Sequence, residues 1–143
     1  MSMGLERFTK AQEDSYEIAL AEIKSGRKDS HWMWYVFPQI EGLGFSEISM
    51  YYAIRDLDEA KEYLADPILG KRLLEISTAV AELPETNAGR IFGTPDDLKL
   101  RSSMTLFHCA DPDEKIFSIV LDKYYDGEMD PKTLEILKKQ ALQ

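Results

Sequence analysis

Cysteine is nearly absent from this sequence: one residue of 143, Cys109, is a cysteine. A lone cysteine cannot form an internal disulfide bond, so the chain lacks the covalent cross-links on which small secreted domains rely. The composition therefore predicts a protein of a reducing compartment, and we expect a cytoplasmic location.

Long apolar runs are absent as well. No stretch of the sequence approaches the ~20 apolar residues that a membrane-spanning helix requires. The first eight residues, Met1–Phe8, lack the basic region and apolar core that together mark a secretory signal. We therefore expect no membrane partner.

Basic residues are outnumbered, because 17 Lys and Arg stand against 26 Asp and Glu, for a formal net charge of −9. Nucleic-acid binding needs basic surface that neutralises phosphates, so this balance argues against nucleic acid as a partner. An excess of acidic residues is instead typical of a protein that its charge keeps in solution.

Motifs for metal binding and covalent catalysis are missing. There is no His-Glu-x-x-His and no cysteine pair, and His31 and His108 are not spaced as a ligand pair. No Gly-x-Ser-x-Gly elbow offers a nucleophilic serine. On a helix, Cys109 diverges from His108 by about 100°, so the two form no dyad. The sequence predicts no metal and no cofactor, and it identifies no catalytic residue.

What the chain does contain is enough material for one core. A length of 143 residues fits a single domain spanning 1–143, and 44% of the residues are apolar. A chain of this size buries about two-thirds of its unfolded surface without cross-links.

Signals for helix starts recur along the sequence. Thr9, with Gln12 three residues later, is typical of a capping box. Ser46 precedes a stretch of helical periodicity, and Pro67 follows the capping residue Asp66. Three more oxygen-bearing caps stand directly before a proline: Thr94–Pro95, Asp111–Pro112 and Asp130–Pro131.

Strand signals are weak by comparison, with no Asn-Gly or Asp-Gly hairpin and no sustained apolar alternation. The stripe formed by Leu69, Leu73, Ile76, Val80 and Leu83 instead alternates steps of four and three residues, as one face of a helix does. The sequence predicts a single compact all-α domain of six to eight helices.

An aromatic segment, residues 30–39 (SHWMWYVFPQ), holds both tryptophans and one of the two histidines. Ser30 is predicted to cap a short helix from His31 to Val36, which ends before Pro38. Because such a helix is apolar nearly all round, burial in the core is the favoured interpretation.

The same segment has a functional interpretation. Tryptophan and tyrosine each add a polar tip to an apolar body, so a pocket lined by them can stack on a flat ligand. In this interpretation His31, Trp34 and Tyr35 stack on or orient the ligand, and Gln39 lies at the rim.

Residues 26–29 (GRKD) lead into the amides at Ser30. Basic residues beside a helix N-terminus suit an anion, because exposed N–H groups and the helix dipole both favour negative charge. The favoured alternative places Lys28 on a solvated turn.

A second polar cluster lies on the helix expected after Thr94. Arg101, Ser102, Thr105 and His108 fall on one helix face, where a guanidinium, two hydroxyls and an imidazole can bind a phosphate or a carboxylate. The competing interpretation is an ordinary solvated face.

Several motifs are arranged in a specific order over nearly the whole chain, and they are Ser30–Trp34, Phe37–Gln39, Gly42–Gly44, Ile91–Gly93, Lys99–Leu100 and Ser102–Phe107. In this order the chain resembles the bacterial and fungal family catalogued as domain of unknown function 1810. The resemblance implies a small, cytosolic, mainly α-helical protein whose activity is unassigned.

A second similarity concerns layout alone. Asn87–Arg90 and the helix pair from Asp97 to Tyr125 are similar in arrangement to small α-helical glycosidase domains that act on ADP-ribose derivatives. The glutamate-containing early motif of those domains has no counterpart here, so the similarity carries over no catalytic residue.

The leading hypothesis is a domain that binds a small anionic molecule, with an enzymatic action on nucleotide- or ADP-ribose-like molecules left open. The two polar and aromatic motifs would then meet at one cleft. The residues predicted to bind the ligand are Lys28, His31, Trp34, Tyr35, Gln39, Arg101, Ser103 and Thr105.

The alternative is a non-enzymatic protein-interaction module, in which both motifs belong to the core. This alternative requires an exposed apolar patch larger than a few hundred Å². Tyr51, Tyr52, Tyr124 and Tyr125 are the candidates for it. The sequence leaves the oligomeric state open.

Overall fold

The computed structural model describes residues 4–142, and within that range the chain is helical, with one isolated bridge between Ile40 and Ile54 in place of any strand. Six helices have seven or more residues and three are shorter. In chain order they are α1 (Glu6–Lys24), α2 (Met33–Val36), α3 (Glu47–Tyr51), α4 (Leu57–Ala65), α5 (Leu69–Glu82), α6 (Ala88–Phe92), α7 (Asp96–Ala110), α8 (Ile116–Tyr125) and α9 (Pro131–Ala141).

The predicted fold class, one compact all-α domain, is confirmed, but the helix count exceeds the predicted six to eight. The helix that the sequence did not reveal is α6, which has five residues and is capped by the side chain of Asn87. A helix of little more than one turn shows no apolar period, so periodicity cannot detect it.

Two of the predicted caps are confirmed at atomic detail. The side chain of Ser46 accepts a hydrogen bond from the Ser49 amide at the start of α3, and that of Asp130 accepts one from the Thr133 amide at the start of α9. Pro131 occupies the first turn of α9, where its missing N–H costs nothing.

Other predicted helix starts are shifted in the structure, that of α7 by one residue and those of α1 and α8 by more. The helix α1 begins at Glu6, so Thr9 lies inside it and forms no capping box. The helix α7 follows Pro95 without a side-chain cap, and α8 begins only at Ile116, after a turn that Asp111 precedes. At α8 the turn after Asp111 shifts the first helical residue downstream, whereas α1 starts upstream of Thr9, because a cap motif by itself does not fix where the first turn closes.

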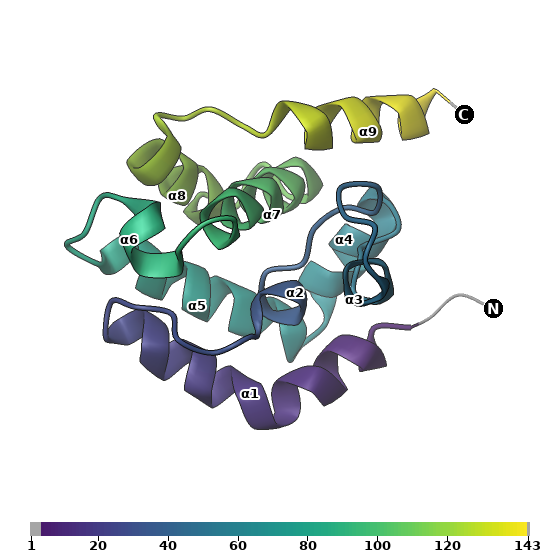
Figure 1. Cartoon of the computed structure of the whole chain (residues 1–143). Coiled ribbons are helices and arrows are strands. Elements are labelled where there is room, and N and C mark those ends of the chain that lie inside the picture. The colour runs from purple at the N-terminus through teal and green to yellow at the C-terminus, as the bar shows by residue number, and fades with distance from the viewer. Residues whose placement is uncertain (1–3, 143) are drawn as a thin grey trace.

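The helices pack in layers around α7, which crosses the middle of the molecule between α1 on one side and α9 on the other (Figure 1). Four aromatic rings join the layers through neighbouring pairs. Between ring centres, Phe8 of α1 is 5.2 Å from Tyr63 of α4, and Tyr63 is 5.2 Å from Phe107 of α7. The ring centre of Phe107 is 5.9 Å from that of Phe117 of α8. All four side chains are fully buried, so they form a continuous row of aromatic contacts through the core.

The connection from α1 to α2 is organised by one carboxylate. Glu22 Oε1 accepts hydrogen bonds from the amides of Asp29 and Ser30 and from Trp32 Nε1, at 2.8, 2.9 and 2.9 Å. Burial alone raises the pKa of Glu22, but the donors at Ser30, Asp29 and Trp32 outweigh it and lower the pKa to about 2. Ser30 therefore caps no helix, contrary to the prediction, because its hydroxyl donates to Glu22 Oε2 instead.

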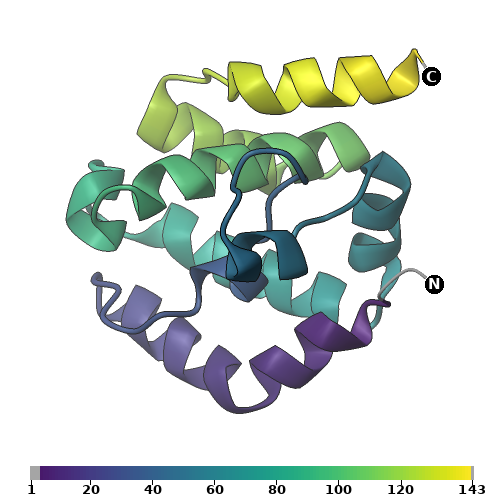
Figure 2. The same ribbon diagram turned by 45° about the vertical axis from the view of Figure 1, so that its right-hand side comes forward.

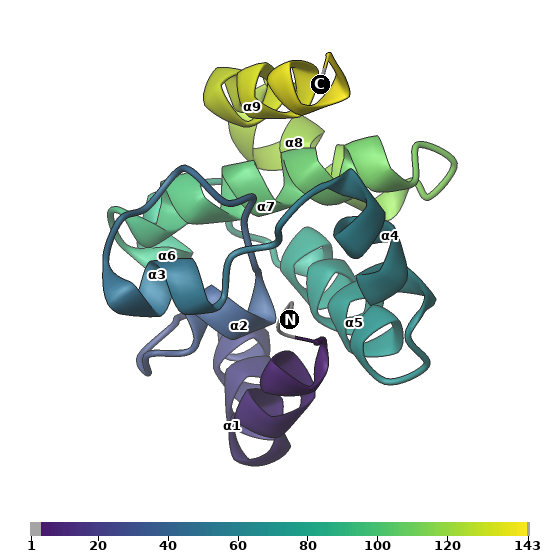
Figure 3. The same ribbon diagram turned by 90° about the vertical axis from the view of Figure 1, so that its right-hand side faces the viewer.

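The connection from α2 to α4 contains a loop that we call the strap, residues 41–53. The isolated bridge closes its base, since the Glu41 amide donates to the Ile54 carbonyl and the Ile54 amide donates to the Gln39 carbonyl, both at 2.8 Å. From this base the strap arches across α7, and it carries the short helix α3, none of whose residues is buried (Figures 2 and 3).

Candidate functional site

A cavity of about 260 Å³ lies between the strap and α7. One wall comes from the aromatic segment, a second from the strap, a third from the first half of α7, and the last from the start of α9. The polar and aromatic residues that line it are Trp34, Gln39, Ser49, Tyr52, Lys99, Ser102, Asp130 and Lys132.

An ammonium group lies on an aromatic face in this cavity. Lys99 Nζ is 4.9 Å from the centre of the Trp34 ring, within the range of a cation–π interaction. The same nitrogen is 3.3 Å from Asp96 Oδ1, while Lys28 Nζ is 2.9 Å from Asp96 Oδ2. One carboxylate thus serves two ammonium groups and leaves one positive charge in surplus beside the cavity.

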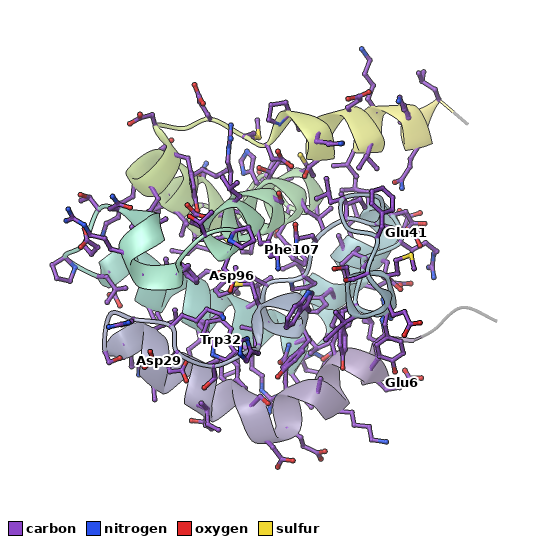
Figure 4. The ribbon with its side chains drawn as sticks, in the orientation of Figure 1. Glu6, Asp29, Trp32, Glu41, Asp96 and Phe107 are labelled. Atoms are coloured by element: carbon purple, nitrogen blue, oxygen red, sulfur yellow. The ribbon has the colours of Figure 1, made fainter. Side chains whose placement is uncertain are left out.

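Lys28 is the inner member of this group of three. Its side chain is 7% exposed, donates to the Ser30 carbonyl at 2.6 Å and lies 5.1 Å from the Trp32 ring centre. The favoured prediction, a lysine on a solvated turn, is therefore wrong. Lys28 Nζ thus contacts both Asp96 and Trp32, which are labelled in Figure 4, and of the two ammonium groups it is Lys99 that lines the cavity.

The strap contributes an aromatic side chain to the cavity. The Tyr52 ring lies 5.3 Å from that of Tyr35, 5.9 Å from that of Phe8 and 4.8 Å from that of Tyr51. Burial, with smaller contributions from Tyr51 and Tyr35, raises the pKa of Tyr52 above its ordinary value of 10. The phenol therefore stays protonated near neutral pH and presents a hydrogen-bond donor.

The carboxylate of the cavity, Asp130, is already engaged. Its Oδ2 accepts hydrogen bonds from Ser102 Oγ at 3.0 Å, from Thr133 Oγ1 at 2.6 Å and from the Thr133 amide at 3.2 Å. Its own amide donates to Thr105 Oγ1 at 2.9 Å. Asp130 thus ties α9 to α7 through one oxygen, Oδ2, which caps α9 and accepts from Ser102.

The predicted ligand residues of the aromatic segment divide into two groups. Trp34 and Gln39 line the cavity, whereas Tyr35 lies outside the lining, with its ring against Tyr52 and its hydroxyl on Ser15 Oγ at 3.0 Å. His31 is exposed and is also outside the lining. The ligand-binding role of all four stays a prediction.

The predicted ligand residues of α7 do not line the cavity. Arg101 donates to the carbonyls of Glu128 and Met129 at 2.9 and 3.0 Å, so its guanidinium holds the loop before α9. Ser103 and Thr105 are fully buried, and Thr105 Oγ1 donates to the Arg101 carbonyl at 2.8 Å. Arg101 and Thr105 therefore face α9 and the loop before it, whereas Ser102 on the same face also lines the cavity.

The residues of α7 that do line the cavity are sequence neighbours of Arg101 and Ser103. Lys99 and Ser102 stand three residues apart, so they share a face, and Leu98 and Pro95 line the same wall. One hint of this region is present in the sequence, since Lys99 and Gly42–Gly44 both belong to the motifs of the family resemblance. The contact between Lys99 and Trp34 cannot be predicted from local periodicity, because the two residues are far apart in sequence.

Residues 4–142 contain neither a metal-binding cluster nor a membrane-spanning helix. No group of three or more His, Cys, Asp or Glu side chains is arranged to hold a metal ion. Across the same described range, every helix is too short or too polar to span a membrane.

Comparison with known proteins gives two matches. The model of the family described as "Protein of unknown function (DUF1810)" matches residues 2–137. The crystal structure of the conserved hypothetical protein Rv1873 from Mycobacterium tuberculosis superimposes with a TM-score of 0.92 at 45% sequence identity, over 94% of this chain and 96% of that one. Among curated proteins, none matches the chain.

Proposed function

The chain belongs to the DUF1810 family of unknown function, and from that premise we propose that it binds a small anionic molecule with a planar ring. The ligand occupies the cavity between the strap and α7, with its ring beside Trp34 and Tyr52 and its anionic group at Lys99. This proposal keeps the small-ligand hypothesis but moves the anion from Arg101 to Lys99.

The observation that carries the proposal is the charge at Lys99. The whole chain has a formal net charge of −9, yet Lys28, Asp96 and Lys99 together leave one positive charge at this wall. At the start of α9, Lys132 adds a positive charge and Asp130 a negative one, so the single surplus charge at Lys99 remains. A local positive charge on an aromatic face, within an acidic protein, favours a ligand that is both anionic and flat.

The volume of the cavity limits the size of the ligand. Pockets for drug-sized ligands measure about 300–1,000 Å³, and this one measures about 260 Å³. A mononucleotide, a sugar phosphate or an aromatic carboxylate is of suitable size. A molecule as long as ADP-ribose would have to leave part of its length outside.

The contacts favour binding over acid–base catalysis. A general base must be free to accept the proton of a substrate, and Asp130 is the one carboxylate among the described lining residues. Its Oδ2 caps α9 and accepts from Ser102, and no second carboxylate, histidine or thiol stands beside it among the described lining residues, so we infer a binding protein and assign no catalytic residue.

Isothermal titration calorimetry tests the proposal with four probes: inorganic phosphate, ribose 5-phosphate, AMP and nicotinate. We expect at least one ring-bearing anion to bind more tightly than phosphate alone. In Lys99→Gln the affinity should fall about tenfold, the equivalent of one charge-assisted hydrogen bond. The matched control is Lys139→Gln, since Lys139 is exposed on α9 and pairs with Glu135.

Either of two results would refute the proposal. If none of the four probes binds, there is no support for a small anionic ligand. If the Lys99 and Lys139 variants lose affinity equally, the loss reflects the net charge of the protein and not a contact at Lys99. A circular-dichroism melt of each variant establishes that both are folded at the titration temperature.

One observation favours the second candidate, a protein-interaction module. The outer side of the strap exposes four large apolar side chains close together in sequence: Phe45, Ile48, Met50 and Tyr51. Contiguous exposed apolar surface is typical of interaction sites. Sedimentation velocity over a range of concentrations measures whether a second copy docks there, and dimerisation abolished by Phe45→Asp would favour this function.

A further inference from the structure

A buried arginine lies behind the strap, outside the cavity. Arg7, in the first turn of α1, is 7% exposed and is not a lining residue. Its Nε donates to the carbonyl of Tyr51 and its Nη2 donates to that of Ala53, both at 2.8 Å. These two carbonyls flank Tyr52, so one guanidinium holds the backbone on both sides of a cavity-lining residue.

The guanidinium is itself held from several directions. Its Nη2 is 3.3 Å from Oε1 of the buried Glu59, and its Nη1 donates to the Gly4 carbonyl at 2.6 Å. Its Cζ lies 4.3 Å from the Phe8 ring centre. The Glu59 carboxylate also accepts the Arg55 amide at 2.9 Å, just beyond the strap. A planar fork of five donors satisfies such a set, and a lysine ammonium does not.

The other supports of this wall are few. The helix α3 buries none of its residues, so packing of α3 contributes little to the position of the strap. The bridge at Ile54 holds its base, and the Tyr52 ring lies against Phe8 and Tyr35. Leu43 also packs against the core, and at the end of the strap the backbone on both sides of Tyr52 is held by the hydrogen bonds to Arg7.

We propose that Arg7 is the positioning residue of the ligand site: it sets where Tyr52 and Ala53 stand, and with them the shape of the cavity. The inference rests on the proposed function, because cavity shape matters only if a ligand fills it. Preorganised walls raise affinity by removing the cost of ordering them on binding.

The test compares two identical substitutions, Arg7→Lys and Arg72→Lys. Lysine at position 7 keeps a positive charge for Glu59 but cannot hold both carbonyls at once. Arg72 is a matched control because it also packs on α1, with its Cζ 5.2 Å from the Tyr16 ring centre, and it does not line the cavity.

Two quantities are measured at a temperature where both variants are fully folded. One is the affinity for the same four probes by calorimetry, and the other is amide hydrogen exchange at Glu41 and Ile54, the bridge at the base of the strap. For Arg7→Lys we expect about a tenfold loss of affinity together with faster exchange at these amides. Arg72→Lys should stay within about twofold of the wild type in both.

The outcomes separate the two proposals. Probe binding by Arg7→Lys at wild-type affinity, or equal weakening in both variants, would overturn the role of Arg7 and leave the proposed function standing. If the wild type binds none of the probes, the proposed function fails, and hydrogen exchange decides alone. Unchanged exchange at Glu41 and Ile54 in Arg7→Lys would then overturn the role of Arg7 as well.

Discussion

The two connections that flank α2 are ordered by opposite means. The connection before α2 folds around Glu22, a carboxylate seven to ten residues away in sequence, and its tryptophan, Trp32, is 1% exposed. The strap after α2 is held by Arg7, more than forty residues away, and its outermost side chain, Phe45, is 78% exposed.

The first connection therefore serves the stability of the fold, whereas the strap is free to form the wall of a ligand site. A loop that satisfies its own donors locally and buries its aromatic ring stabilises the fold. The strap, closed at its base by the Ile54 bridge and held from behind by Arg7, leaves its inner side for a cavity and its outer side for solvent. Trp32 and Trp34, two residues apart, fall on the two sides of this division, since Trp34 is half-buried and lines the cavity.

The largest effect is expected from the buried tryptophan. Trp32→Ala should lower the free energy of unfolding by about 3–5 kcal/mol, because it leaves a large cavity in the core. Trp34→Ala should cost roughly half as much, since its ring is only partly withdrawn from water. Urea denaturation followed by circular dichroism measures both, and equal losses would break the proposed division between the two connections.

The next effect comes from the carboxylate that orders the first connection. Glu22→Gln should lower the free energy of unfolding at pH 7 by about 1–2 kcal/mol, because the donors of Ser30, Asp29 and Trp32 lose a charged acceptor. The folded-state pKa, about 2, lies below the ordinary 4.5, so Glu22 contributes fully above pH 4.5.

The pH dependence follows from the sign of that shift. The stability difference between wild type and Glu22→Gln should stay constant from pH 8 to pH 6 and shrink as the pH falls from 4.5 toward 2. Denaturation midpoints measured across this range check it. A difference that persists unchanged at pH 2.5 would mean that the carboxylate charge is not what orders the connection.

The smallest effect is expected on the outer side of the strap. Phe45→Ser should change the free energy of unfolding by less than about 0.5 kcal/mol, because the ring is already in solvent. Its affinity for the four probes should also match the wild type, since Phe45 does not line the cavity. A loss above 1 kcal/mol in the same denaturation assay would show that the strap is ordered by its outer face.

Much of the fold could be predicted because its causes are local. An apolar stripe such as that of α5 and a cap such as Asp130 act within one or two turns, and both are found in the structure. Helix starts were misplaced where a turn separates the cap motif from the first helical residue, as between Asp111 and Ile116. The short helix α6 escaped detection because little more than one turn shows no apolar period, whereas α2 and α3 were indicated by the aromatic segment and by the cap Ser46.

The candidate site could be predicted only in part. Trp34 and Gln39 were named from their aromatic and amide chemistry, and the structure places both in the cavity lining. Arg101 was named for the same kind of reason, but its guanidinium meets the carbonyls before α9. Chemical suitability is a property of the residue, whereas exposure to a cavity depends on which other element packs against it.

The sequence by itself determined the helical class, the single domain, the family and the aromatic segment, because composition, periodicity and motif order are written along the chain. Only the tertiary structure decided that Lys99 meets Trp34, that Lys28 is buried against Asp96, and that Arg7 supports the strap. Each of these contacts joins residues far apart in sequence. They exist because the core brings α1, α7 and the strap together, and no local pattern encodes that arrangement.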